Sequence, residues 1–170
     1  MLFHVSEQAG IERFDPRWSE IAGRNVVWAI DAEHLRNYLL PRECPRVTYY
    51  AGPQTESADI EKFLGESRAV VAIESGWFER IRACRLYCYH LSADSFECVD
   101  ECAGYFVSDL PVVPTSVEVL DDLIHQLLKR NVELRFVPNL WPLRDAVVAS
   151  TLQFSLIRMR NSQARIAHSS

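Results

Sequence analysis

The sequence predicts an α+β fold in which a mixed, mainly antiparallel sheet is flanked by helices. Short apolar or alternating runs typical of strands are mixed with segments of helical periodicity, and no regular strand–helix–strand alternation links them. The 170 residues include 48% hydrophobic residues and no repeat or low-complexity tract, which suits one domain with a sizeable core. We therefore expect a single domain over residues 1–161, followed by a disordered polar tail over residues 162–170.

The expected strands are short runs bounded by turn residues, and the run over residues 26–30 is apolar enough to be buried. In the run over residues 84–91, alternation places Leu86, Cys88 and His90 on the opposite face from two tyrosines. The expected strands cover residues 2–6, 26–30, 46–51, 70–73, 84–91, 96–99, 104–108 and 132–137, with an irregular segment over 7–25.

Capping residues mark the expected helices in the first half of the chain. Asp31 is a candidate N-cap for a helix over residues 32–40, which Pro41 would end. Ser57 and Ser75 are candidate N-caps of two shorter helical segments.

Two further helices are expected in the second half. One begins at Ser116 and carries an apolar stripe at helical spacing. The stripe consists of Val117, Leu120, Leu123, Ile124, Leu127 and Leu128. The last helix is expected over residues 143–160, after a loop that contains Trp141, whose indole would pack that helix against the sheet.

The net charge of −5 argues against broad nucleic-acid binding, which depends on clustered positive charge. Arginine strongly outnumbers lysine, since only Lys62 and Lys129 are lysines. Either a coding bias or an arginine-lined pocket for carboxylates or phosphates would produce that ratio. No run approaches the roughly 20 apolar residues that span a bilayer, and the N-terminus lacks the features of a signal peptide. We therefore expect a soluble, cytoplasmic protein without a membrane partner, and the sequence leaves its oligomeric state open.

The five cysteines are expected to be reduced, buried and inert. Cys84 and Cys88 lie in an expected strand, where a spacing of four residues separates side chains by roughly 13 Å. Zinc sites use closer spacings, so we expect no metal site. The chain also lacks a glycine-rich phosphate loop, a Gly-x-Ser-x-Gly elbow and a His-Glu-x-x-His motif, which excludes the enzyme classes that those motifs define.

His4, on the first expected strand, is the leading candidate for a functional residue. It lies in the run Leu-Phe-His-Val-Ser over residues 2–6, in which His4 and Ser6 share one strand face. Two interpretations are open. His4 is either a core histidine whose ring nitrogens bind backbone groups, or it donates a hydrogen bond to a ribose hydroxyl with support from Ser6.

The first strand and the segment after it resemble the opening of ADP-ribosyltransferase-like domains of the His-Tyr-Glu type. That group includes RNA 2′-phosphotransferases and DNA ADP-ribosyltransferases of the DarT type. The resemblance rests on residues 2–6, on Gly10-Ile11 and on Phe14-Asp15-Pro16-Arg17, and it extends to the apolar second strand that leads into a helix over residues 26–40. It implies an ADP-ribosyltransferase-like core.

The chain as a whole is most similar to an uncharacterised family of small bacterial proteins. This closer resemblance covers nearly the whole chain and implies no known activity. It also involves the segments Tyr38–Arg42, Cys44–Arg46, Glu101–Tyr105 and Leu140–Leu143.

The transferase resemblance implies roles for several residues. In those enzymes a histidine binds the adenosine-side ribose, an aromatic residue stacks on nicotinamide, and a glutamate orients the second ribose. The resemblance therefore implies NAD⁺ as the cofactor, His4 as the ribose-binding residue of the catalytic site, and Tyr49 or Tyr50 as the stacking residue. It also implies that Arg42 and Arg46 hold the pyrophosphate through charge-assisted hydrogen bonds.

The chain departs from the transferase pattern at the position of the catalytic glutamate. Residues 104–108, followed by residues 111–114, resemble the last catalytic strand, but Gly104 occupies the position of the carboxylate. Glu101 is the nearest alternative and Asp100 the next. A carboxylate there would stabilise an oxocarbenium-like species electrostatically. Glu101 is therefore the candidate catalytic carboxylate, and the competing interpretation is a solvated residue at a strand end.

Two functions are consistent with these observations. The first is an enzyme or degenerate enzyme that uses NAD⁺ or a related nucleotide. The second is a non-catalytic regulatory module, in which the region of Trp28, Arg42, Tyr49 and Tyr50 binds a nucleotide or a partner peptide. A third option is an interaction protein whose exposed apolar surface forms a dimer contact.

Overall fold

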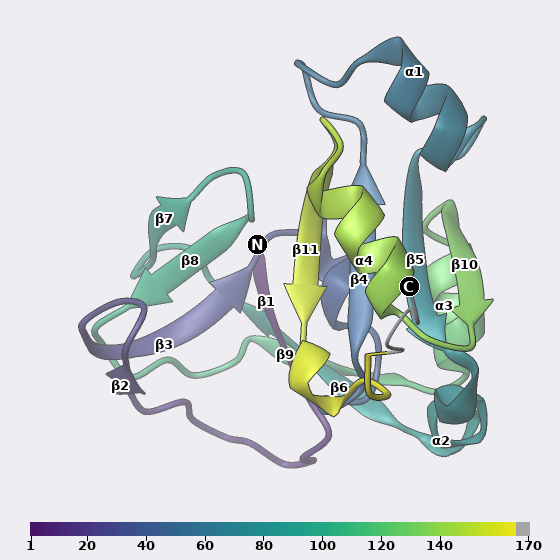
Figure 1. Ribbon diagram of the computed structural model, residues 1–170. Coiled ribbons are helices and arrows are strands. Elements are labelled where there is room, and N and C mark those ends of the chain that lie inside the picture. Colours follow the sequence, from purple (N-terminus) through teal and green to yellow (C-terminus); the bar gives the residue numbers. More distant parts are fainter. Residues whose placement is uncertain (166–170) are drawn as a thin grey trace. The chain divides into compact units, whose positions relative to one another are not determined.

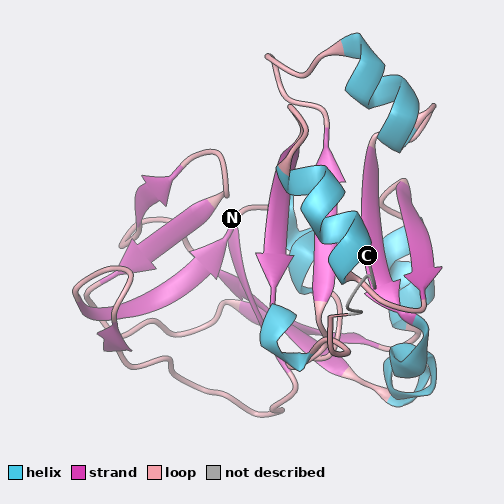
Figure 2. Cartoon of the chain, in the orientation of Figure 1, coloured by secondary structure: helices cyan, strands magenta, loops and turns pink. Residues whose placement is uncertain are grey.

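The computed structural model describes residues 1–165 and divides into two compact units (Figure 1). The first unit consists of Met1–Arg42 and Cys84–Asp122, and the second consists of residues 43–83 together with the described residues from 123 onward. Strands outnumber helices and pair mostly in antiparallel fashion, which confirms the predicted α+β class (Figure 2). The single domain expected over residues 1–161 stays a prediction.

The first unit is built on an antiparallel sheet in the strand order β7-β8-β3-β1-β6-β9, with β2 paired to β3 (Figure 1). Its strands are β1 (Leu2–Ser6), β2 (Arg17–Ser19), β3 (Arg24–Ile30), β6 (Leu86–Leu91), β7 (Glu97–Asp100), β8 (Tyr105–Ser108) and β9 (Ser116–Leu120), and its one helical element is the 3₁₀ helix η1 (His34–Tyr38). β1 therefore lies in the interior of the sheet, between β3 and β6.

One face of this sheet is covered by the segment that follows β1. Leu2, Val27 and Leu91 belong to a buried cluster on this face, and Phe14 packs against that cluster. The Tyr89 hydroxyl donates to the Gln8 carbonyl at 2.7 Å and accepts from the Ile11 amide at 3.1 Å. A backbone bridge between Phe14 and Val112 closes the same segment further along. The segment expected to be irregular is thus anchored at two points, and it includes the short strand β2.

The second unit contains a four-stranded sheet in the order β10-β5-β4-β11. Its strands are β4 (Arg46–Tyr50), β5 (Ala69–Glu74), β10 (Val132–Val137) and β11 (Gln153–Ile157). The β10–β5 pair is parallel, and the other two pairs are antiparallel. The core combines β4 and β5 residues such as Val47 and Val70 with Leu140 and Val147, so helix α4 (Trp141–Val148) packs on this sheet.

The helical elements of the second unit are short. They are α1 (Ser57–Asp59), the π-helical turn η2 (Ile60–Leu64), η3 (Ser75–Trp77), α2 (Phe78–Ala83), α3 (Leu123–Leu128), α4 (Trp141–Val148) and η4 (Met159–Asn161). No helix among the described residues is both long enough and apolar enough to cross a membrane.

The expected helix from Ser116 is wrong in its first half. Residues 116–120 form β9, which pairs with β6, and only residues 123–128 are helical. Val117 and Val119 are β-branched and exposed on one face of this edge strand, while Leu120 is buried on the other face, so Val117 and Leu120 do not share the face that helical spacing predicts. Asp122 has a φ of 49°, which no α-helix accommodates, and this residue separates the strand from the helix.

The expected last helix, over residues 143–160, is also wrong. Helix α4 begins at Trp141 and ends at Val148, and residues 153–157 form β11. The Ser150 hydroxyl donates to the Val147 carbonyl at 2.6 Å and accepts from the Leu152 amide at 3.2 Å. This hydroxyl satisfies backbone groups that a continuing helix would have paired, so the chain turns there.

Three smaller expectations are also corrected. Asp31 accepts a hydrogen bond from the His34 amide at 2.8 Å, as its capping role predicts, but the helix after it is only the 3₁₀ turn η1. Cys84 precedes β6 and does not lie in it. Cys98 and Cys102 are exposed, so the expectation that all five thiols are buried is wrong.

The structure describes only the first residues of the tail expected from residue 162. Gln163 and Arg165 form hydrogen bonds within the second unit. Residues 166–170 lie outside the described part of the chain.

Candidate functional site

The imidazole of His4 bonds to the main chain of the neighbouring strand. Its Nδ1 lies 2.9 Å from the carbonyl oxygen of Trp28. Because a carbonyl oxygen only accepts, Nδ1 carries the proton, and Nε2 of the neutral ring keeps its lone pair. The register between β1 and β3 consists of the single pair Phe3–Ile30, so the ring binds a carbonyl just beyond the point where the strand ladder stops.

Burial keeps the His4 ring neutral. The side chain is partly buried, and its ring centroid lies 4.5 Å from that of Phe14. Desolvation lowers the pKa of His4 below 6.5, and the positive charges of Arg42 and Arg17 lower it further, against the opposing effect of the Trp28 bond. At neutral pH the free Nε2 is therefore a hydrogen-bond acceptor.

Arg17 and Arg42 are two exposed cations close enough to His4 to act on its pKa. The main-chain amide of Arg42 donates to the Glu7 carboxylate at 2.7 Å, so that carboxylate also lies at the rim of this site. Within residues 1–165, neither guanidinium forms a hydrogen bond or an ion pair. By contrast, Arg24 in the same unit is paired with two carboxylates.

Ser6 and Trp28 differ in their relation to this site. Directly paired residues of an antiparallel ladder share a face, and His4–Tyr89 and Ser6–Tyr87 are such pairs. Ser6 is therefore on the His4 face, as predicted, and its hydroxyl accepts from the Gln8 amide at 3.0 Å. Trp28 and Ile30 are two residues apart in β3, so they share a face, and Ile30 shares that face with its partner Phe3. The Trp28 indole therefore lies on the face of the sheet opposite to His4.

Arg46, Tyr49 and Tyr50 belong to the second unit. Arg46 is only 2% exposed and donates to the Cys44 carbonyl at 2.9 Å. Tyr49 has no exposed surface and packs in the core, and its hydroxyl accepts from Arg135 at 2.8 Å. This burial raises the pKa of Tyr49. The pyrophosphate and stacking roles of these residues stay predictions, whereas the contacts of Arg46 and Tyr49 are those of core residues.

Gly104 has a physical reason to be glycine. Its φ of +67° is unfavourable for residues with a side chain, and a Cβ there would lie 2.3 Å from His34 Nδ1 and 2.6 Å from Asp31 Oδ2. A glutamate therefore does not fit at this position. Glu101 is exposed in the turn between β7 and β8, and its catalytic role stays a prediction.

The side chains packed on Gly104 form a polar pair that the sequence analysis treated only as a helix cap. Asp31 Oδ1 lies 2.8 Å from His34 Nδ1, and the Asp31 amide donates to the Gly104 carbonyl at 3.1 Å. His34 is buried. The pattern Asp-x-x-His directly after a buried strand was the available signal, since both residues then lie in the first turn after the strand.

A separate hollow of about 300 Å³ lies in the second unit and contains none of the predicted site residues. It is lined by Gly52, Pro53, Gln54, Thr55, Thr151 and Gln153. We therefore take His4, with Arg17 and Arg42 whose charges lower its pKa, as the candidate functional site and call it the His4 site.

Comparison with known proteins gives one match. No curated protein and no solved structure matches the chain. The model of a family of unknown function, DUF6886, matches residues 3–162, which confirms the expected similarity to an uncharacterised family over nearly the whole chain. The ADP-ribosyltransferase core and the bacterial origin stay predictions. With this match spanning both units and the His4 site, the chain belongs to the DUF6886 family.

Proposed function

We propose that the His4 site binds the phosphorylated ribose of a nucleotide such as ADP-ribose or NAD⁺. The observation that carries the proposal is a pair of exposed arginines, both without ion-pair partners in the described residues, whose charges act on a neutral histidine with its Nδ1 already bonded. Guanidinium groups without ion-pair partners can form charge-assisted hydrogen bonds, so Arg17 and Arg42 near one histidine suit an anionic ligand.

The three side chains supply complementary chemistry. The His4 Nε2 lone pair accepts the proton of a ribose hydroxyl, and its position is held by the 2.9 Å bond from Nδ1 to Trp28. Arg17 and Arg42 offer planar guanidinium forks that form charge-assisted hydrogen bonds with phosphate oxygens. A sugar with hydroxyls next to a phosphate satisfies both requirements at once.

Binding without turnover is the function that this geometry supports best. Gly104 brings no carboxylate to the strand where the transferase resemblance expects one, and the Asp31 carboxylate near Gly104 is bonded to His34. A non-catalytic nucleotide-binding module is therefore the proposed function. ADP-ribosyl transfer with Glu101 as its carboxylate is the more specific alternative.

Calorimetric titration with ADP-ribose and NAD⁺ tests the proposal. We expect saturable binding that weakens about tenfold or more in Arg42→Ala and in Arg17→Ala, since each change removes a hydrogen bond to a charged group. Arg68→Ala is the matched control, because Arg68 is an exposed arginine of the second unit, and it should bind as the wild type does. Absence of heat with the folded wild type, or equal affinity in all three variants, would refute the proposal. Turnover of NAD⁺ that is lost in Glu101→Gln would instead favour the enzyme.

A further inference from the structure

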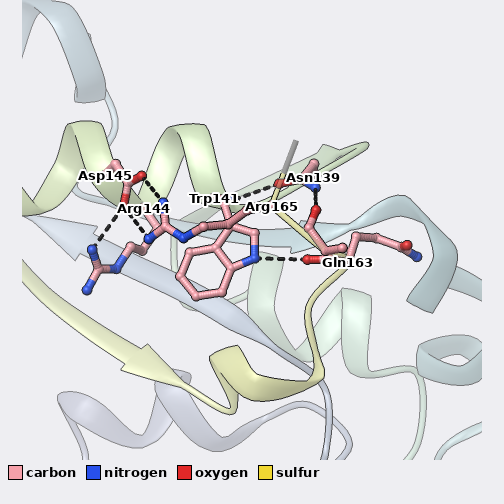
Figure 3. A network of polar contacts seen from close by, with 7 residues as sticks. Asn139, Trp141, Arg144, Asp145, Gln163 and Arg165 are labelled. Atoms are coloured by element: carbon pink, nitrogen blue, oxygen red, sulfur yellow. Dashed lines mark hydrogen bonds and ion pairs between the residues drawn. The ribbon is translucent and has the colours of Figure 1, made fainter. Parts of the chain in front are cut away.

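Residues 163–165 lie along the second unit and are held through both main-chain and side-chain groups (Figure 3). The Gln163 amide donates to the Glu74 carboxylate at 3.1 Å, and the Gln163 carbonyl accepts from Trp141 Nε1 at 2.9 Å. The Ala164 carbonyl accepts from Asn139 Nδ2 at 2.8 Å. Three main-chain polar groups of this segment are therefore satisfied by side chains at the end of β5, just before α4 and at its start.

Arg165 occupies a position that suits a guanidinium group. Its two terminal nitrogens donate to the two oxygens of Asp145, at 2.6 and 3.2 Å. Its guanidinium carbon lies 4.1 Å from the centroid of the Trp141 ring, in cation–π range. Figure 3 shows the carboxylate and the indole both directed at this side chain. Arg165 is the main cause of the lowered pKa of Asp145, with Arg144 second.

Glu74 gives the strongest indication that this arrangement is built for a peptide. Its side chain is only 2% exposed, and in the described chain its carboxylate bonds only to the backbone amides of Leu140 and Gln163. A buried carboxylate is costly unless its hydrogen bonds are satisfied. One amide, that of Leu140, fixes the carboxylate in place, and the other comes from the segment that is bound.

Of the three side chains in this segment, these contacts select only that of the arginine. Gln163 and Ala164 are bound through main-chain groups, and Arg165 is bound through its side chain. Main-chain hydrogen bonds combined with one side-chain pocket are the general means by which proteins bind short extended peptides. We propose that Glu74, Asn139, Trp141 and Asp145 form a binding site for a short peptide with an arginine two residues after the amide that Glu74 binds.

In the chain itself this peptide site is filled intramolecularly by residues 163–165. A tethered segment acts at an effective concentration in the millimolar range, so it competes with any free peptide of the same pattern. An arginine-containing segment of another protein therefore binds only when it displaces the chain's own segment. This inference is independent of the His4 site.

Binding of a labelled Ser-Gln-Ala-Arg peptide, the sequence of residues 162–165, tests this site in the full-length protein. Fluorescence anisotropy should show the peptide binding Arg165→Ala about tenfold more tightly than the wild type, because the internal competitor has lost its charged hydrogen bonds. Arg165→Lys, which keeps the charge but lacks the bidentate fork, should give an intermediate gain and serves as a second acceptor. Adding Asp145→Asn to Arg165→Ala should abolish binding, and a peptide with alanine in place of arginine should not bind.

Arg160→Ala is the matched control, because Arg160 is an exposed arginine of the same C-terminal region that pairs with Glu43 and lies outside the peptide site. It should bind the peptide as weakly as the wild type does. Circular dichroism confirms that each variant is folded before its affinity is compared. Equal affinity of the wild type and both Arg165 variants, or binding that Asp145→Asn leaves intact, would overturn the proposal and make the segment a packing element only.

Discussion

The His4 imidazole donates from Nδ1 to the Trp28 carbonyl at 2.9 Å, where β1 and β3 no longer pair through their backbones. One side chain thus satisfies a main-chain acceptor of β3 and presents its second nitrogen at the sheet face where Phe14 packs. The two interpretations of this histidine are therefore compatible. One ring nitrogen has the structural role, and the proposed function assigns the other to a ligand.

His4→Ala should lower the free energy of unfolding by about 2 kcal/mol, because it removes a hydrogen bond to a partly buried carbonyl together with the packing on Phe14. Urea denaturation measures the change. His4→Asn, whose amide can donate to the same carbonyl, should recover part of the loss. An unchanged denaturation midpoint in His4→Ala would show that the bond to Trp28 contributes nothing to stability.

The stability that neutral His4 confers should decline as the solution is acidified. The folded-state pKa lies below the ordinary value of 6.5, so the unfolded chain binds the proton more readily. The contribution is complete above pH 6.5 and falls as the pH drops from there toward the lowered folded-state value. Denaturation at pH 7.5, 6.5 and 5.5 should therefore show the difference between wild type and His4→Ala shrinking with acidity. A difference that grows with acidity would mean that folding raises the pKa of His4.

Gly104→Ala should destabilise the protein much more than Gly23→Ala. Both glycines have positive φ, +67° and +66°, but a Cβ at Gly23 meets nothing within 4 Å, whereas one at Gly104 collides with His34 and Asp31. We expect about 1 kcal/mol for Gly23→Ala from the backbone conformation alone, and about 3 kcal/mol or more for Gly104→Ala. Thermal denaturation of the two variants makes the comparison, and equal losses would argue against the close packing on Gly104.

Tyr49→Phe should reduce stability by about 1 kcal/mol, because it removes the acceptor for Arg135 inside the core of the second unit. Nucleotide affinity should not change, since the proposed site does not use Tyr49. Calorimetry and urea denaturation on the same preparation separate the two effects. Loss of nucleotide binding at unchanged stability would restore Tyr49 as a ligand-binding residue.

Local sequence patterns predicted the strands better than the helices. The bounds of the first strand, residues 2–6, and of the strand over residues 132–137 agree with the structure, because each is a short run bounded by polar or turn residues. The helix expected from Ser116 failed although Val117 and Leu120 have helical spacing, because residues 116–120 pair with β6 as a strand that exposes Val117 and buries Leu120 on the other face.

The candidate site was predicted only in part. His4 and Ser6 share a face because of strand alternation, which a sequence displays directly. The approach of Arg17 and Arg42 to His4 depends on the fold of segments that are distant in sequence, and no local pattern specifies it. The same holds for Arg165 and Asp145, which lie twenty residues apart in the chain.

Histidine-selective NMR during titration with ADP-ribose tests whether His4 binds a nucleotide. The protein has five histidines, and with ¹⁵N-labelled rings their Nε2 and Nδ1 signals are followed individually. A nucleotide bound at His4 should give a saturable shift of His4 Nε2, with Nδ1 of the same ring still protonated and with the His90 and His125 signals unchanged. A titration that leaves His4 Nε2 unshifted, or that shifts all of the histidines alike, would contradict a nucleotide site at His4.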